Sequence, residues 1–229
     1  MRILAIDCAT AACSVAIWVD GAVHTVERRE MSHGQGEALL PMIGRVRTRA
    51  GLAFVELDRL AVTIGPGHFT GLRSGLAAAR GLALATGLPL VGVTTLDAVA
   101  AAVPPPEREG AVLAVALDSK RAEAYVQAFA ADGAPLAPPL ARRPIDYADE
   151  LRQAVTPGSR FVVAGDAAPE LVRVLQENGA VAVLSSAAPR PDAAAVAALA
   201  AAAAPSAPPA PLYVHPVETT WPRPRAARA

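Results

Sequence analysis

Near its start the chain carries the sequence RILAIDCATAACSVAIWV, residues 2–19. Residues 2–7 form an apolar run that ends on a carboxylate, and residues 13–19 form a second apolar run. The small residues 9–12 between the two runs are typical of a turn, so the pattern predicts two strands joined as a hairpin. We expect a third strand to follow over residues 22–29.

The rest of the first half alternates helix and strand. Apolar residues at helical spacing predict a helix from residue 36 to Gly51, and Thr70 is the expected N-cap of a second helix that ends near residue 86. The other expected elements are a buried strand at 60–64, a glycine-rich turn at 65–69, a strand at 90–93 and a short helix at 96–103.

The second half begins, like the first, with a hairpin, which follows the proline-rich linker 104–110. Its expected elements are strands at 111–117 and 122–130, a helix at 145–154, a strand at 160–164, a helix at 169–178, a strand at 181–184 and an alanine helix at 192–204. The predicted units are an N-terminal lobe, 1–103, a C-terminal lobe, 110–204, and a Pro/Arg-rich strap and tail, 205–229. Two such halves predict an α/β, actin-like and Hsp70-like (ASKHA) two-lobed fold with mixed sheets flanked by helices.

Composition and charge exclude several classes of protein. Lys+Arg and Asp+Glu number 21 each, which gives a formal net charge of +0 and is unlike a stand-alone nucleic-acid binder. The single lysine, Lys120, lies outside any glycine-rich cradle, so the chain is not a P-loop NTPase. The apolar run at 192–204 is too short to cross a membrane, no signal peptide is expected, and we predict a cytoplasmic protein.

The glycine-rich segment GPGHFTGLRSG, residues 65–75, joins a strand to a helix. Glycines at such a junction leave backbone N–H groups available to an anion, but they also permit a tight turn and close helix packing. Asp7 and Thr10, at the end of the first strand, resemble the phosphate loop of actin-like ATPases, and the alternative is an aspartate that only stabilises a turn. The candidate vestigial phosphate loop comprises Asp7, Thr10, Gly65, Gly67 and Thr70.

The histidines predict neither a metal site nor a catalytic site. His33 and Glu37 are one helical turn apart, but two ligands do not make a catalytic metal site. Ser32 beside His33, and His68 near Thr70, are candidates for a nucleophile and base, without an orienting acid to complete the set. We therefore expect no bound metal and no cofactor.

Two further pairs have a structural and a chemical interpretation. Asp118 and Glu123 bracket a turn, where they are expected to satisfy turn amides rather than to act as a catalytic carboxylate pair. Cys8 and Cys13 are too few for a disulfide scaffold or a four-ligand zinc site, and they fit a reducing compartment. Their odd spacing predicts buried thiols on different faces of their strands.

Three segments together resemble the TsaB (YeaZ) family, namely ILAIDCAT with CSVA at 3–16, LLPMI at 39–43 and GPGHFTGLR at 65–73. RAEAY at 121–125 and PLYV at 211–214 extend the likeness over most of the chain. The resemblance implies an actin-like fold and a non-catalytic role in making threonylcarbamoyladenosine beside the anticodon of tRNA. It also implies homologues of TsaD and of the ATPase TsaE as partners, tRNA only within the complex, and a homodimer when the chain is alone.

The resemblance points to two first-lobe helices as the docking surface. The catalytic paralogue TsaD has two metal-binding histidines at four-residue spacing, whereas this chain has HGQGE at 33–37. The interface candidates are Leu39, Leu40, Ile43 and Val46 on one helix, and Gly71, Leu72, Gly75, Leu76 and Ala79 on the other. The alternative is that both stripes face their own sheet.

A second class of function stays open, that of an autonomous actin-like phosphotransferase or glycoprotease-like peptidase. ATP turnover by the chain alone distinguishes it from a scaffold. The tail residues Arg223, Arg225 and Arg228 are candidates for tRNA phosphate contacts, with a solvated terminus as the alternative.

Overall fold

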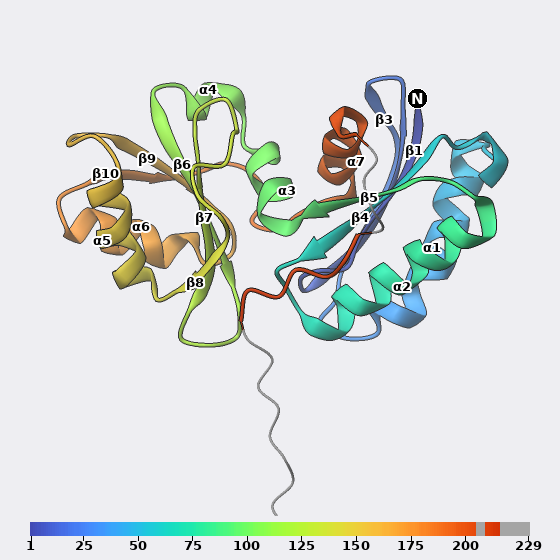
Figure 1. Ribbon diagram of the computed structural model, residues 1–229, viewed down its shortest axis with the longest axis horizontal. Coiled ribbons are helices and arrows are strands. Elements are labelled where there is room, and N and C mark those ends of the chain that lie inside the picture. The colour runs from blue at the N-terminus through green and yellow to red at the C-terminus, as the bar shows by residue number, and fades with distance from the viewer. Residues whose placement is uncertain (205–208, 216–229) are drawn as a thin grey trace, which may run out of the picture.

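The computed structural model describes residues 1–204 and 209–215, which form two lobes that each contain a five-stranded sheet (Figure 1). Of the expected strap and tail, residues 209–215 are described. The three tail arginines proposed for tRNA contact lie outside the described residues.

The first sheet has the strand order β3-β2-β1-β4-β5. Its strands are β1 (Arg2–Asp7), β2 (Ala12–Val19), β3 (Ala22–Glu30), β4 (Arg59–Gly65) and β5 (Leu90–Thr94). β1 and β2 pair antiparallel with Ile3 opposite Trp18, so the predicted hairpin is confirmed, and β3 extends it. β4 pairs parallel to β1 and β5 parallel to β4, as strands joined through helices do.

The second sheet repeats this connectivity, with the order β10-β9-β6-β7-β8. Its strands are β6 (Ala111–Asp118), β7 (Ala124–Phe129), β8 (Leu140–Arg142), β9 (Arg160–Ala164) and β10 (Val181–Leu184). β6, β7 and β8 are antiparallel, whereas β9 and β10 are parallel to β6. The two lobes are therefore built alike, as two mixed sheets flanked by helices.

Helices α1 (Gln35–Ala50) and α2 (Phe69–Thr86) cover one face of the first sheet, and the 3-10 turn η1 (Phe54–Glu56) follows α1 (Figure 1). Their inward side chains pack with those of β1, β2 and β4 in one apolar cluster. α2 begins at Phe69 with His68 as its N-cap, so the prediction that Thr70 is the cap is wrong. The Leu72 N–H already donates to the His68 carbonyl (2.9 Å), which starts the helix earlier.

The opposite face of the first sheet carries α7 (Ala193–Ala202) and α3 (Thr95–Ala102). We expected residues 192–204 in the C-terminal lobe, but α7 packs against the first-sheet residues Ala5, Ala16 and Ala61 instead. Small side chains on both surfaces allow this close approach, and a helix that is apolar all round has no stripe to indicate which sheet it covers. Arg59 also donates from its Nη1 to the carbonyls of Ala200 and Ala203, at the C-terminal end of α7.

In the second lobe, α5 (Pro144–Ala154) and α6 (Ala168–Glu177) cover one face of the sheet, and α3 packs against the other face. The linker 104–110 contains the short helix α4 (Pro105–Arg108). Its Glu107 carboxylate accepts hydrogen bonds from the Ser185 hydroxyl (2.7 Å) and the Ser186 N–H, so this connection is folded rather than extended. In the described part of the chain, no helix combines the length and apolar character that a membrane span requires.

The lobe boundary at 104–110 stays a prediction, and cleavage there has an expected result. The C-terminal fragment carries α7, which packs on the first sheet of the N-terminal fragment. A chain cut at a protease site engineered into the linker is therefore expected to elute as one species of parental size, although a denaturing gel shows two fragments. Separate elution of the fragments would contradict the placement of α7.

Candidate functional site

A cavity of about 950 Å³ opens where loops of both lobes meet the C-terminal strap. The first lobe contributes residues 32–35, before and at the start of α1, and residues 67–71, at the start of α2. The second lobe contributes the β6–β7 turn, 119–121, together with Tyr125, and the strap contributes residues 212–215. The cavity is thus assembled from four segments that are distant in the sequence.

Aromatic and cationic side chains hold the strap against α2. The Leu212 N–H donates to the carbonyl of Ile64 at the end of β4 (2.7 Å). The Arg73 guanidinium lies 3.6 Å from the centre of the Phe69 ring, and its Nε donates to the Tyr213 hydroxyl (3.0 Å). The cation–π stack orients Arg73, and the two hydrogen bonds hold the strap against β4 and α2.

The cavity wall suits an anion better than a cation. Its titratable lining residues are Lys120, Arg121, His33, His68, His215, Tyr125 and Tyr213, and no carboxylate lines it among the described residues. The first backbone N–H groups of α2 have no acceptor within the helix and lie at the same wall. Lys120 is partly neutralised because its ammonium group pairs with Asp118. Burial lowers the pKa of His68, and the nearby charge of Lys120 lowers it further.

Asp7 and Thr10 lie beneath this wall rather than in it. Asp7 is fully buried, and its Oδ1 accepts hydrogen bonds from the Ala9 N–H (3.1 Å) and the Thr63 hydroxyl (2.8 Å). The Ala9 carbonyl accepts from the His68 N–H (2.7 Å), and a Cβ at Gly67 would stand 2.1 Å from that carbonyl oxygen. The Ala9 backbone therefore occupies the space next to Gly67, where a phosphate would have to approach. This favours the interpretation that the glycines permit close packing.

Of the candidate phosphate-loop residues, Gly67 and Thr70 reach the cavity. Gly65 instead lies under the strap, where an added Cβ would stand 2.8 Å from the Leu212 carbonyl oxygen. The five residues are thus divided between the cavity wall and the core beneath it. Phosphate binding by this set stays a prediction.

The carboxyl group of Asp7 gives the protein a measurable pH dependence. Burial raises its pKa from 3.8 to about 6, although the two hydrogen bonds to Oδ1 act in the opposite direction. Because the folded-state pKa lies above the unfolded value, the folded protein holds the proton more tightly, and this contribution to stability is lost as the pH rises through about 6.

The Asp7→Asn variant lacks this titration and keeps an Oδ1 acceptor. The unfolding free energy of the variant minus that of the parent is expected to increase between about pH 4 and pH 7, by roughly 2 kcal/mol. Urea denaturation of both proteins across that range measures the difference. A difference that is constant, or that decreases with rising pH, would show that Asp7 is not protonated on burial.

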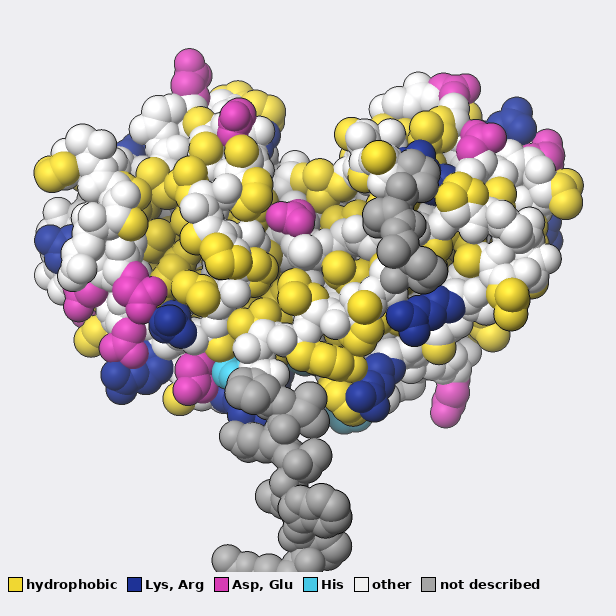
Figure 2. Space-filling model, in the orientation of Figure 1, with side chains coloured by type: hydrophobic (Ala, Val, Ile, Leu, Met, Phe, Trp, Pro, Cys, Tyr) yellow, Lys and Arg dark blue, Asp and Glu magenta, His cyan; other side chains and the backbone are white. Residues whose placement is uncertain are grey.

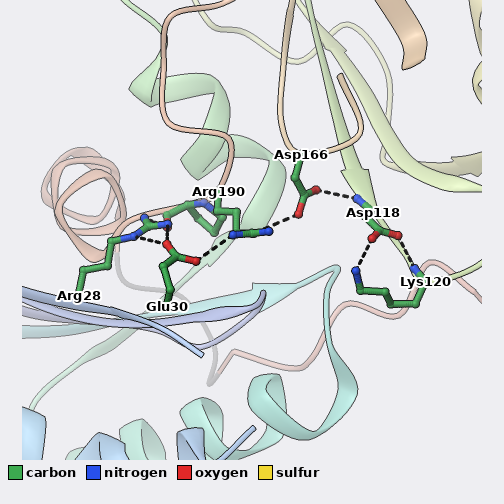
Figure 3. A network of polar contacts seen from close by, with 7 residues as sticks. Arg28, Glu30, Asp118, Lys120, Asp166 and Arg190 are labelled. Atoms are coloured by element: carbon green, nitrogen blue, oxygen red, sulfur yellow. Dashed lines mark hydrogen bonds and ion pairs between the residues drawn. The ribbon is translucent and has the colours of Figure 1, made fainter. Parts of the chain in front are cut away.

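A chain of ion pairs and hydrogen bonds crosses from one lobe to the other (Figure 3). Arg190, in the segment between β10 and α7, binds Glu30 of β3 (2.8 Å) and Asp166 of the second lobe (3.2 Å). Asp166 in turn accepts from the backbone N–H of Asp118 (2.8 Å). Asp118 is thus engaged with Lys120 and Asp166 and is not paired with Glu123. Sequence reasoning missed Arg190 and Asp166, because both lie in loops without a motif.

Histidine and carboxylate groups do not converge on a metal site within residues 1–204 and 209–215. The Ser32 hydroxyl and His33 Nδ1 do lie within hydrogen-bond distance, 3.0 Å apart, in an exposed loop. Among the described residues, no carboxylate forms a hydrogen bond or ion pair with this ring. The arrangement therefore does not form the nucleophile, base and acid set that a hydrolase needs.

Cys8 and Cys13 are both buried, as predicted, but they do not point to different faces. Their Sγ atoms are 3.3 Å apart. The pairing of Asp7 with Ser14 explains this, because the next pair outward in the same register is Cys8 and Cys13. Alternation by sequence spacing applies within one strand, whereas these two residues lie across the hairpin from each other.

The proposed docking residues have mostly inward positions. Leu40 is 59% exposed, but the other eight are buried against the first sheet, as the alternative interpretation had it: Leu39, Ile43, Val46, Gly71, Leu72, Gly75, Leu76 and Ala79. The outward faces of the same helices still carry apolar residues, with Leu84 of α2 89% exposed. One view of the surface shows cationic and anionic side chains interspersed over both lobes (Figure 2).

Comparison with known proteins assigns the chain to a family. Residues 29–144, half of the chain, match the family model described as TsaD, tRNA N6-adenosine threonylcarbamoyltransferase. The tRNA threonylcarbamoyladenosine biosynthesis protein TsaB of Escherichia coli K12 is 44% identical over 126 residues, which cover 55% of this chain and 53% of that protein. The chain belongs to the TsaB (YeaZ) family. The match spans about half the length of that curated relative.

Solved structures agree with this assignment. YeaZ from Pseudomonas aeruginosa superposes with a TM-score of 0.71 at 26% identity, over 87% of this chain and 90% of that one. The activator of 2-hydroxyisocaproyl-CoA dehydratase from Clostridium difficile has a TM-score of 0.52 at 13% identity, over 88% of this chain and 94% of that one, and it shares the fold alone. The predicted actin-like, two-lobed architecture of this TsaB-family chain is confirmed.

Proposed function

We propose that this TsaB-family protein is a non-catalytic scaffold subunit for the synthesis of N6-threonylcarbamoyladenosine in tRNA. The observation that carries the proposal is its 44% identity to a protein named for that biosynthesis. Two observations support it. Glu37 stands four residues after His33, where the catalytic paralogue has its second metal histidine, and the Ala9 backbone occupies the space next to Gly67.

The outward faces of α1 and α2 are the proposed docking surface. The two helices lie side by side on the first sheet (Figure 1), and each exposes an apolar side chain, Leu40 on α1 and Leu84 on α2. Single exposed leucines are common on protein surfaces, so the support for this docking surface comes from the family relationship and not from their exposure. We propose a TsaD homologue as that partner, with a TsaE homologue joining the complex, and a second copy of this chain as the occupant when it is alone.

Reconstitution tests the proposed function. The modified nucleoside is measured in tRNA incubated with the TsaD and TsaE homologues and a threonylcarbamoyl donor, with and without this protein. Omission of the chain is expected to abolish modification, and the chain alone is expected to turn over no ATP. Equal modification without the chain would refute the scaffold, and ATP turnover by the isolated chain would favour the autonomous phosphotransferase.

A further inference from the structure

The two cysteines of the chain form a close, buried pair at the first hairpin. Cys8 is 1% exposed and Cys13 is fully buried, and a hydrogen bond joins their sulfur atoms at 3.3 Å. Cys8 and Cys13 directly follow Asp7 and Ser14, the last pair of the β1–β2 register. Residues opposite each other in an antiparallel pair have Cα atoms about 4.5–5.5 Å apart, which lies within the range that a disulfide spans. Joining the two sulfur atoms therefore requires no change in the pairing of β1 with β2.

Helix α2 presents glycines to this pair. An added Cβ at Gly75 would lie 3.5 Å from the Cβ of Cys8, and one at Gly71 would lie 2.3 Å from the Cys8 carbonyl oxygen. Because glycine has no side chain, only backbone atoms of α2 face the turn at these two positions. A local separation of the turn from α2 that is too small to unfold the lobe can admit a small oxidant.

We propose that Cys8 and Cys13 are a redox-active pair that a peroxide converts to an intramolecular disulfide. The hydrogen bond between the thiols determines which sulfur reacts first, since it lowers the pKa of Cys13 and raises that of Cys8. The Cys13 thiolate is therefore the nucleophile. This inference is independent of the proposed scaffold function.

The reaction balances with one peroxide for each pair. The Cys13 thiolate attacks one oxygen of hydrogen peroxide, the O–O bond breaks, and the departing hydroxide takes up a proton to form water. The resulting Cys13 sulfenic acid is attacked by the sulfur of Cys8, which loses its proton as the S–S bond forms and a second water leaves. Two thiols lose two electrons in total, and the peroxide gains them.

Thiol counting and intact mass test the proposal on the full chain. The reduced protein is treated with hydrogen peroxide, freed of the oxidant, denatured and labelled with a maleimide. The parent is expected to lose the mass of two hydrogen atoms, to take up no label instead of two, and to remain monomeric on a non-reducing denaturing gel. Dithiothreitol is expected to restore both labels, because a disulfide is reversible and a sulfinic or sulfonic acid is not.

The single variants Cys8→Ser and Cys13→Ser are the matched controls. Cys8→Ser keeps the Cys13 thiol and is expected to gain oxygen under the same treatment, whereas Cys13→Ser keeps only the Cys8 thiol and is expected to stay unoxidised. Neither variant is expected to show the reversible loss of two hydrogens. Retention of both labels by the treated parent, independent oxygen uptake at the two sulfurs, or a disulfide between two chains would each overturn the proposal. The measurement on the parent decides the outcome even where a serine variant fails to fold.

Discussion

Adding a methyl group at Gly71 is expected to destabilise the protein, although alanine is the better helix former. The Cβ of Gly71→Ala would stand 2.3 Å from the carbonyl oxygen of Cys8, a distance that side-chain rearrangement cannot relieve because the contacted atom is backbone. Either α2 or the β1–β2 turn must move. Overpacking of this kind typically costs about 1–3 kcal/mol, and we expect a loss of that size in the free energy of unfolding.

The matched control is Gly81→Ala in the same helix. An added Cβ at Gly81 meets no atom within 4 Å, so the helix-forming preference of alanine acts alone. This variant is expected to gain about 0.5–1 kcal/mol of stability. Urea denaturation of both variants and the parent, at one protein concentration, measures the contrast. Changes of the same sign in the two variants would show that α2 does not approach the turn as closely as described.

The Gly71 contact also explains why the sequence indicated a small-residue row without indicating its partner. Spacing alone predicts that something approaches this side of α2 closely, and a second helix satisfies that pattern as well as a turn does. The structure identifies the approaching group as the Cys8 backbone of the same chain. The small-residue row of α2 is therefore buried inside the lobe and is not part of the proposed docking surface.

The features that could be predicted from the sequence are those determined by residues close together in the chain. The opening hairpin and the alternation of helix and strand follow from local patterns of apolar residues and turn residues. The placement of α7, the interlobe bridge of Arg190 and the Cys8–Cys13 contact depend on groups brought together from distant or facing segments. The apolar, alanine-rich helix α7 has no polar face, and an arginine in a loop has no periodicity, so no local pattern could locate either.

The cavity could not be predicted from the sequence either, because its lining residues come from distant segments. His33, His68 and Lys120 stand out individually in the sequence as isolated titratable groups. Their convergence requires the duplicated sheet topology, which brings the β6–β7 turn of one lobe opposite the start of α2 in the other. The strap residue Tyr213 completes the wall, where Arg73 donates a hydrogen bond to it.

Replacing Leu40 by glutamate is expected to disrupt docking and leave the fold intact. Leu40 is 59% exposed on α1, so a carboxylate there remains solvated in the isolated chain. In a complex with a TsaD homologue the same carboxylate would be buried without a partner, which is costly in an apolar contact. We expect Leu40→Glu to weaken association by roughly 10- to 100-fold, measured by calorimetry after circular dichroism has confirmed folding.

Val55→Glu is the control, because Val55 is 91% exposed on η1, which follows the C-terminal end of α1 and belongs to neither helix. It changes the net charge equally and introduces the same side chain, so its affinity for the TsaD homologue is expected to match that of the parent. Ile43→Glu does not serve the purpose, since Ile43 is 2% exposed in the core of the first lobe and a carboxylate there unfolds the chain. A folded Leu40→Glu variant that binds as tightly as Val55→Glu would place the interface away from the outward face of α1, while reconstitution would still decide whether the protein is a scaffold at all.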